Sequence, residues 1–134
     1  MTSGHGGCLT TVHATYPRDT LSRLETMAMM SDVDIPLFAL RVQLASAVDV
    51  VVQTSRQRDG SRCVTHISEV CGYNDAEGFL IQDICRRDPD TSGQSTSGLT
   101  ELYFTGYMPS FSDEIMVSGH QIPPSLFRAA EARQ

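Results

Sequence analysis

The chain has 134 residues, which is the length of one small domain with a hydrophobic core of its own. Its residues are 40% hydrophobic and 19% charged, a balance that is typical of a globular protein and excludes a disordered one. The net charge of −6 argues against nonspecific binding to nucleic acid or to an anionic membrane surface.

The basic residues are also informative, because all ten are arginines and the chain contains no lysine. A Walker A motif needs a lysine for the β- and γ-phosphates of its nucleotide, so the chain by itself cannot form an ordinary P-loop ATPase site. No apolar run is long enough to span a bilayer, and the first residues lack the pattern of a secretory leader. The four widely spaced cysteines favour reduced, mostly buried thiols in a cytoplasmic protein.

The first third of the chain predicts a strand and two helices. Residues 9–14 are rich in β-formers and follow a run of glycines, which predicts a short buried strand. Pro17 fits the first position of a helix, although Tyr16 before it lacks a short side-chain acceptor for an N-cap. Pro36 opens a second helix. The expected apolar faces are Leu21, Leu24, Met27 and Ala28 on the first helix, and Leu37, Leu40, Leu44, Ala47 and Val48 on the second.

The middle of the chain predicts an antiparallel meander. A run of β-branched residues follows the second helix, and Asp59 with Gly60 forms a hairpin turn signal. Two more strand patterns follow with one more turn between them. The three expected strands are residues 48–53, 62–73 and 79–85, with the second turn at residues 74–78.

The last third is less regular. Residues 88–98 are rich in Ser, Thr and Gly, which predicts either a mobile linker or an exposed loop. Beyond it we expect a strand at 102–107 and two short helices at 110–117 and 124–133. We therefore divide the chain into a main unit at 1–87, this linker or loop at 88–98, and a small C-terminal appendage at 99–134.

Residues 3–25 combine a glycine-rich turn, a short strand that ends in His13 and a helix that is opened by Pro17. This stretch resembles the histidine box of the type II/IV secretion ATPases, and especially that of the CpaF/TadA type, which drives assembly of tight-adherence (Flp) pili. The resemblance covers most of the chain, because residues 36–53, 58–70, 103–111 and 122–127 are similar to later parts of that family.

The resemblance implies an α/β fold, namely the C-terminal portion of a RecA-like P-loop ATPase core without its Walker A half. In that family the histidine box follows both Walker motifs, whereas here it begins at the first residues. We therefore expect a C-terminal fragment of a motor that powers type II/IV secretion or pilus biogenesis, and expect it to be inactive alone. ATP and Mg²⁺ would belong to the complete parent, with none expected for this chain alone.

The resemblance also implies partners and a location. The parent is expected to be a homo-hexamer that works with inner-membrane secretion or pilus platform proteins, without nucleic acid and without a transmembrane segment. It would be cytoplasmic or peripheral at the inner membrane. One alternative stays open: the chain is a stand-alone, non-catalytic protein that docks on a secretion ATPase or its partners, through a sheet edge and an apolar face.

His13 is the first candidate site residue. A histidine at the end of a core strand can present a ring N–H to a γ-phosphate or to an attacking water, and the resemblance implies that it senses the nucleotide state. The residues alone favour a histidine that is capped by hydrogen bonds at the edge of the core, and the surrounding motif favours the sensing role. His5 and the glycines at 4, 6 and 7 favour a structural turn over a phosphate cradle.

Three further residues are candidates for contacts with the nucleotide, namely Thr11, Arg18 and Arg23. A guanidinium can hold a phosphate through two hydrogen bonds, and Arg62 shares this capacity, although most charges on a helix simply face solvent. A structural zinc is the rival chemistry, because Cys63, His66 and Cys71 are zinc-compatible types. Side chains alternate along a strand, so Cys63 and His66 should point to opposite faces, and we predict no metal site.

Overall fold

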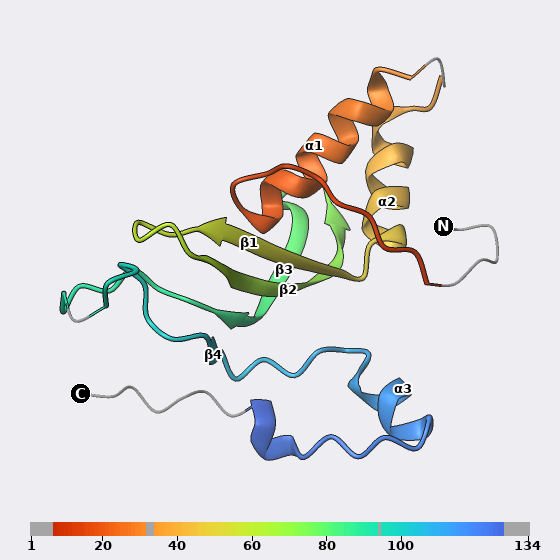
Figure 1. Ribbon diagram of the computed structural model, residues 1–134. Coiled ribbons are helices and arrows are strands. Elements are labelled where there is room, and N and C mark those ends of the chain that lie inside the picture. The colour runs from red at the N-terminus through yellow and green to blue at the C-terminus, as the bar shows by residue number, and fades with distance from the viewer. Residues whose placement is uncertain (1–6, 32–33, 94, 128–134) are drawn as a thin grey trace.

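The computed structural model describes residues 7–31, 34–93 and 95–127, and it has a mixed α/β fold (Figure 1). Two helices, α1 and α2, lie on one side of a four-stranded antiparallel sheet, and the C-terminal segment lies on the other side. The expected α/β class and the antiparallel meander are both confirmed. The four strands are β1 (Val50–Arg56), β2 (Arg62–Asn74), β3 (Gly78–Arg86) and β4 (Tyr103–Phe104), and their order in the sheet follows the chain, as short connections require.

The two helices form where prolines open them. Helix α1 spans Pro17–Met29, with Pro17 in the first turn and Tyr16 as an N-cap that makes no side-chain cap bond. Helix α2 spans Leu37–Ala47, and Pro36 stands at its N-cap position. Both predicted helices are confirmed. A proline costs nothing at a helix start, because the N–H group that it lacks has no partner inside the helix.

The predicted apolar faces need one correction on each helix. Leu21 is fully buried on α1 and Leu24 half-buried, whereas Met27 is 55% exposed. At about 100° per residue, Met27 lies roughly 120° around the helix from Leu21 and so leaves the core face. Leu37, which begins α2, is exposed as well, while Leu40 on the same helix is buried.

The sheet is built from two long hairpins. Strand β1 spans Val50–Arg56, β2 spans Arg62–Asn74 and β3 spans Gly78–Arg86. The turn between β1 and β2 places Gly60 at a φ of +86°, which a residue with a side chain adopts only with strain. The predicted turn at Asp59 and Gly60 is therefore confirmed, and each strand lies within three residues of its expected position.

Two hydrophobic clusters hold these layers together. The first joins the helices to the sheet, and the second joins the sheet to the C-terminal segment. In the first cluster the buried members are Leu21, Ala45, Val51, Val70 and Phe79. In the second they are Ile84, Cys85 and Phe127, with Ile67, Leu102, Phe104, Tyr107, Phe111 and Ile122 packed around them.

Residues 9–14 do not form the predicted strand. They run in extended form past β1, with Leu9 wholly exposed and Val12 and Ala14 half-buried. A strand needs a neighbouring backbone for its hydrogen bonds, and within the described residues no backbone–backbone bond joins this stretch to the sheet. Local β propensity alone is therefore insufficient here.

The C-terminal third contains shorter elements than predicted. Strand β4 is Tyr103–Phe104 only, α3 spans Ser112–Val117, and a 3₁₀ turn spans Pro124–Phe127. The predicted strand at 102–107 ends early because Thr105 turns its hydroxyl onto β3 carbonyl groups and Gly106 takes a positive φ. The end of the predicted helix at 124–133 lies outside the described residues.

The described residues between 88 and 98 belong to a loop that closes on itself. Pro89 pairs with Leu99 in an isolated bridge, and the Asp90 carboxylate accepts hydrogen bonds from the backbone N–H groups of Ser92 and Ser95. The division of the chain at residues 87 and 98 stays a prediction. No helix in the described part of the chain has the length and apolar character that crossing a bilayer requires.

Candidate functional site

The His13 side chain is exposed and lies between two hollows of the surface. One hollow, of about 680 Å³, lies between residues 8–14 and strand β1 and is lined by both. The other, of about 710 Å³, lies between residues 13–15 and helix α1. Within the described residues the His13 ring makes no hydrogen bond, so both ring nitrogens are available to a ligand.

Arg23 lines the second hollow together with His13. It projects from the exposed face of α1, one helical turn after Asp19 and one before Met27, and these side chains line the same hollow. Among the described residues Arg23 makes no salt bridge. The hollow also receives the hydroxyl-bearing side chains of Ser22 and Thr26. A guanidinium, an imidazole, the Asp19 carboxylate and the hydroxyl-bearing side chains of Thr15, Ser22 and Thr26 therefore line one open space.

The other two candidates lie apart from that space. Thr11 is exposed and lines the hollow beside β1. Arg18 turns away: its Nη1 donates a long hydrogen bond of 3.5 Å to the carbonyl oxygen of Glu77, in the turn between β2 and β3. The structure therefore brings His13 and Arg23 together, places Thr11 on the neighbouring hollow, and directs Arg18 to the sheet.

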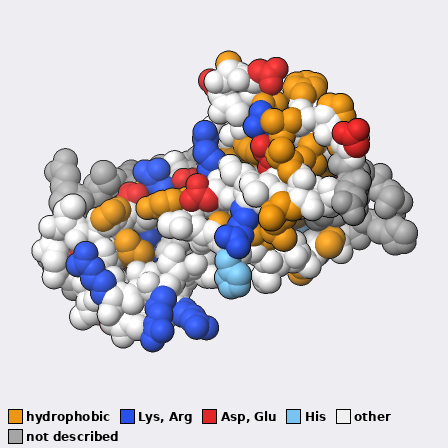
Figure 2. Space-filling view, turned by 90° about the horizontal axis from the view of Figure 1, so that it is seen from above, with side chains coloured by type: hydrophobic (Ala, Val, Ile, Leu, Met, Phe, Trp, Pro, Cys, Tyr) orange, Lys and Arg blue, Asp and Glu red, His pale blue; other side chains and the backbone are white. Residues whose placement is uncertain are grey.

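Apolar side chains surround the site on the helical side of the molecule. Met27 and Met30 form the rim of the second hollow, and both are largely exposed. Seen from above, hydrophobic side chains gather over the two helices (Figure 2). The described residues that contribute exposed hydrophobic groups on α1, α2 and the link after α1 are Met27, Met29, Met30, Leu37, Phe38 and Val42.

Gln53 belongs to the site and was not among the candidates. Its side chain is 8% exposed, and its Nε2 donates a hydrogen bond of 2.9 Å to the carbonyl oxygen of Ala14, the residue after His13. A signal exists in the sequence, because Gln53 follows Val51 at the inward spacing of a buried strand. A polar residue at an inward position of such a run needs a partner from elsewhere in the chain.

The two helices are held to the sheet by a charged cluster near the site. Arg41 on α2 donates two hydrogen bonds of 2.9 Å to the Glu25 carboxylate on α1, and a third of 3.1 Å to the Tyr73 hydroxyl on β2. The hydrogen bonds with Glu25 and Tyr73 raise the pKa of Arg41 above its ordinary value, so this guanidinium stays charged. Arg41 thereby fixes the helix that carries Arg23.

A buried carboxylate lies on the other side of the sheet. The Glu69 side chain on β2 accepts hydrogen bonds from the Tyr107 hydroxyl at 2.8 Å and from the backbone N–H and the hydroxyl of Ser110. Burial raises the pKa of Glu69, but the bonds from Ser110 and Tyr107 outweigh it and hold that pKa below its ordinary value. Hydrogen bonds with Cys71 and Glu69, together with burial, raise the pKa of Tyr107.

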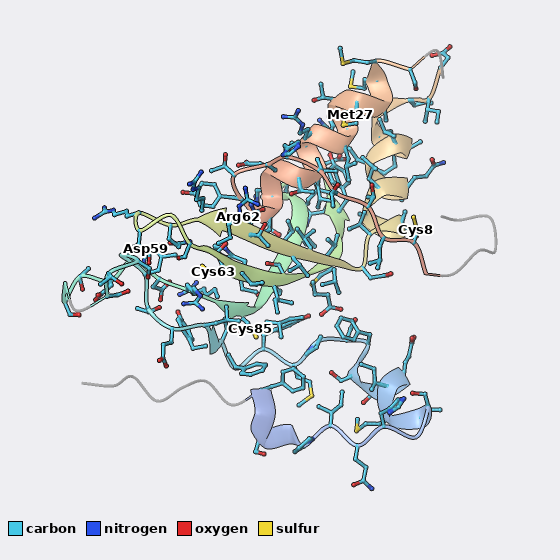
Figure 3. All side chains as sticks on the ribbon, viewed as in Figure 1. Cys8, Met27, Asp59, Arg62, Cys63 and Cys85 are labelled. Atoms are coloured by element: carbon cyan, nitrogen blue, oxygen red, sulfur yellow. The ribbon has the colours of Figure 1, made fainter. Side chains whose placement is uncertain are left out.

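The zinc-compatible residues have separate partners. Cys63 accepts a hydrogen bond from Gln57, His66 contacts the Thr65 hydroxyl, and Cys71 contacts the Tyr107 hydroxyl. Figure 3 shows Cys8 and Cys63 near opposite ends of the sheet. Cys8 and Cys71 are exposed and Cys63 is half-buried, so the prediction of mostly buried thiols holds only for Cys85. Across residues 7–31, 34–93 and 95–127, no three His, Cys, Asp or Glu side chains converge on a metal position. His5, Gly4 and Gly6 lie outside the described residues.

Comparisons with known proteins connect this geometry to a family. Residues 1–101 match the family model described as "Type II/IV secretion system protein". Two proteins of Mycobacterium tuberculosis, from strains CDC 1551 / Oshkosh and H37Rv, have names that propose a role in conjugal transfer. Each is 35% identical to this chain over 78 residues. The matched stretch covers 58% of this chain but 21% of each relative, so the chain spans about a fifth of their length.

The family match covers three quarters of the chain and includes His13, both helices and the strands β1 to β3. The mixed fold, with helices on an antiparallel sheet, is consistent with part of an ATPase-like domain of that family. The chain belongs to the type II/IV secretion system protein family.

Proposed function

We propose that this chain is the C-terminal part of a hexameric secretion or pilus-assembly ATPase, in which His13 senses the state of the bound nucleotide. The observation that carries the proposal is that His13 and Arg23, both exposed, line one hollow of about 710 Å³. Arg23 offers a phosphate two parallel hydrogen bonds, and a neutral imidazole offers one donor.

The groups around this hollow suit one side of a nucleotide phosphate. They provide the guanidinium of Arg23, a ring N–H and the hydroxyl of Thr15, and the Asp19 carboxylate lines the same hollow. The Ser22 and Thr26 hydroxyls also line it, but they donate to carbonyl oxygens of their own helix. The groups around the hollow do not form a complete cradle, because a P-loop lysine is missing from the sequence. In the complete enzyme, ATP bound with Mg²⁺ would be the phosphoryl donor. This chain's residues would contact the phosphate side and would not hydrolyse ATP alone.

The partners follow from the same assignment. We infer a homo-hexamer of the complete protein, with the exposed apolar side chains over α1 and α2 available for subunit contacts, at the cytoplasmic face of an inner-membrane platform. The names of the relatives point to conjugal transfer, and the resemblance of residues 3–25 points to tight-adherence pili of the CpaF/TadA type. A secretion motor serves either task.

A chimeric enzyme tests the role of His13. In it this chain replaces the matching part of a complete, active family ATPase. We expect His13→Ala to leave the hexamer intact by light scattering, and to lower ATP turnover about 100-fold, the loss typical when one donor to a transition state is removed. His120→Ala, at an exposed histidine far along the chain, is the matched control. Equal turnover in both variants would contradict the sensor role.

A second candidate function is a stand-alone protein that docks on a complete ATPase. The observation that favours it is the open edge of β1, where Val50 and Val52 are exposed beside the hollow of residues 8–14. Intact mass spectrometry of the protein from its native cells separates the two. A mass several-fold above 14.7 kDa supports the motor, and a mass of 14.7 kDa supports the docking protein.

A further inference from the structure

Gln53 is a polar residue at a buried, inward-facing position of strand β1. Strand β1 alternates between exposed and buried residues, and Gln53 lies on the buried side together with Val51. An amide that is buried without partners would cost free energy, so such a side chain persists where its hydrogen bonds are satisfied. The partners of Gln53 therefore indicate why an amide stands there.

Those partners lie beside the histidine. One Nε2 proton of Gln53 is directed to the Ala14 carbonyl oxygen at 2.9 Å, across 39 positions of the chain, and Thr54 accepts a longer bond of 3.3 Å. In the described part of the protein, no other hydrogen bond joins residues 8–15 to the sheet. This amide therefore supplies the hydrogen bond that fixes the extended stretch to the sheet, beside the packing of the half-buried Val12 and Ala14.

The backbone of Gln53 is itself fixed from the neighbouring strand. The pairing of β1 with β2 shifts register between Gln53 and Thr54, and such a bulge redirects the side chains next to it. On β2, the hydroxyl of Thr65 donates to the Gln53 carbonyl oxygen at 3.4 Å. Gln53 therefore connects the paired strands β1 and β2 to a stretch that, in the described residues, makes no other hydrogen bond to the sheet.

We propose that Gln53 is a positioning residue for His13. By holding the carbonyl group that follows His13, its amide determines where the imidazole stands relative to the hollow that Arg23 lines. That the position of His13 matters for ATP turnover rests on the proposed function. The hydrogen bond from Gln53 to Ala14 does not rest on it, because the structure shows that bond directly.

The first test is a pair of matched variants of the 134-residue chain, followed by NMR. Gln53→Met keeps the length of the side chain and removes its donor. Gln57→Met makes the same change at the other buried glutamine, whose amide bonds Ser55 and Cys63 and does not touch residues 8–15. We expect Gln53→Met to shift the signals of the His13 ring and the amide signals of residues 13–15, because the carbonyl group of Ala14 loses its donor. Gln57→Met should leave these signals in place.

A second variant covers the case in which Gln53→Met unfolds the chain. Gln53→Glu keeps the shape of the side chain but offers a donor to the Ala14 carbonyl oxygen only when it is protonated. Its His13 and Ala14 signals should differ from wild type at pH 7 and approach those of wild type, at matched pH, as the carboxyl group is protonated. Wild-type signals at pH 7 in whichever of the two variants folds would overturn the proposal.

The chimeric ATPase supplies the functional readout. We expect Gln53→Met to lower kcat with KM unchanged, and to add nothing once His13 is already alanine, because both changes would act through the same imidazole. An equal loss from Gln53→Met in the presence and absence of His13 would overturn the positioning role. If His13→Ala leaves turnover intact, the proposed function fails, and the NMR result still decides whether Gln53 holds this stretch.

Discussion

Glu69 is a carboxylate in the interior with only 4% of its surface exposed, and no cation of the described residues lies within ion-pair distance. Its negative charge is balanced by donors that all come from the C-terminal segment, namely Tyr107 and Ser110. Each hydrogen bond to a charged group contributes about 1.5–3 kcal/mol, and a buried charge that lost them would be strongly destabilising. This residue therefore links β2 to a segment 40 residues later.

Changing Glu69 to Gln tests that link. Gln keeps the shape, but its NH₂ group meets donors where the carboxylate offered acceptors, so we expect the free energy of unfolding to fall by about 2 kcal/mol. Urea denaturation measures the change. Glu101→Gln is the control, because Glu101 is exposed and should stay within about 0.5 kcal/mol of wild type. Equal stability of the two variants would show that the network contributes nothing.

The same carboxylate predicts a pH dependence. Because folding lowers the pKa of Glu69, its contribution is fully present above the unfolded value of about 4.3 and is lost as the pH falls through the folded value. The stability difference between wild type and Glu69→Gln should therefore be constant near pH 7 and shrink below about pH 4. Denaturation midpoints measured across that range check the sign, and a difference that grows in acid would contradict it.

At the scale of elements, α1 packs against the rest of the molecule through one face and lines the hollow beside His13 with another. Leu21 and Leu24 pack into the first cluster, and Arg41 on α2 holds α1 at Glu25. The opposite face presents Asp19, Arg23 and Met27 to the hollow beside His13. A helix can divide its faces in this way because residues three and four apart share a side.

Two substitutions on α1 separate these faces. Leu21→Ala deletes a fully buried side chain and should lower the free energy of unfolding by about 2–5 kcal/mol, through lost burial and the cavity that remains. Met27→Ala, on the exposed face of the same helix, should change it by less than about 0.5 kcal/mol. Chemical denaturation of both variants is the measurement. A large loss from Met27→Ala would restore the original expectation that Met27 faces the core.

At the scale of the whole molecule, the sheet separates two clusters that share no buried residue. The helices cover one side, and the segment from β4 to the final 3₁₀ turn covers the other, where Phe104 and Phe127 meet edge to face with centroids 5.6 Å apart. Distant clusters of this kind respond to substitutions almost independently. The side that carries His13 should thus tolerate changes in the C-terminal segment.

Phe127→Ala tests this independence. We expect faster amide hydrogen exchange across residues 102–127, because the second cluster loses a buried ring, while α1, α2 and β1 keep their protection. Phe38→Ala, at an exposed ring on α2, serves as the comparison. If all elements lose protection together, the two sides form one cooperative unit and the expectation is wrong.

The sequence by itself determined the order of elements, because the signals for them are local. Pro17 and Pro36 open helices, Gly60 permits its turn, and the runs of β-branched residues form strands wherever a neighbouring strand pairs with them. The family could also be recognised from residues 3–25, because a short sequence motif can be identified without knowing which residues pack against it.

Only the tertiary structure decided which groups meet. Residues 9–14 have strand propensity but, in the described residues, no backbone partner, and the side of α1 that packs on the sheet, centred on Leu21, leaves Met27 exposed. The contacts from Gln53 to Ala14 and from Tyr107 to Glu69 join positions 39 and 38 residues apart. Such contacts depend on the whole chain being folded, because no local pattern specifies which distant donor reaches a buried acceptor.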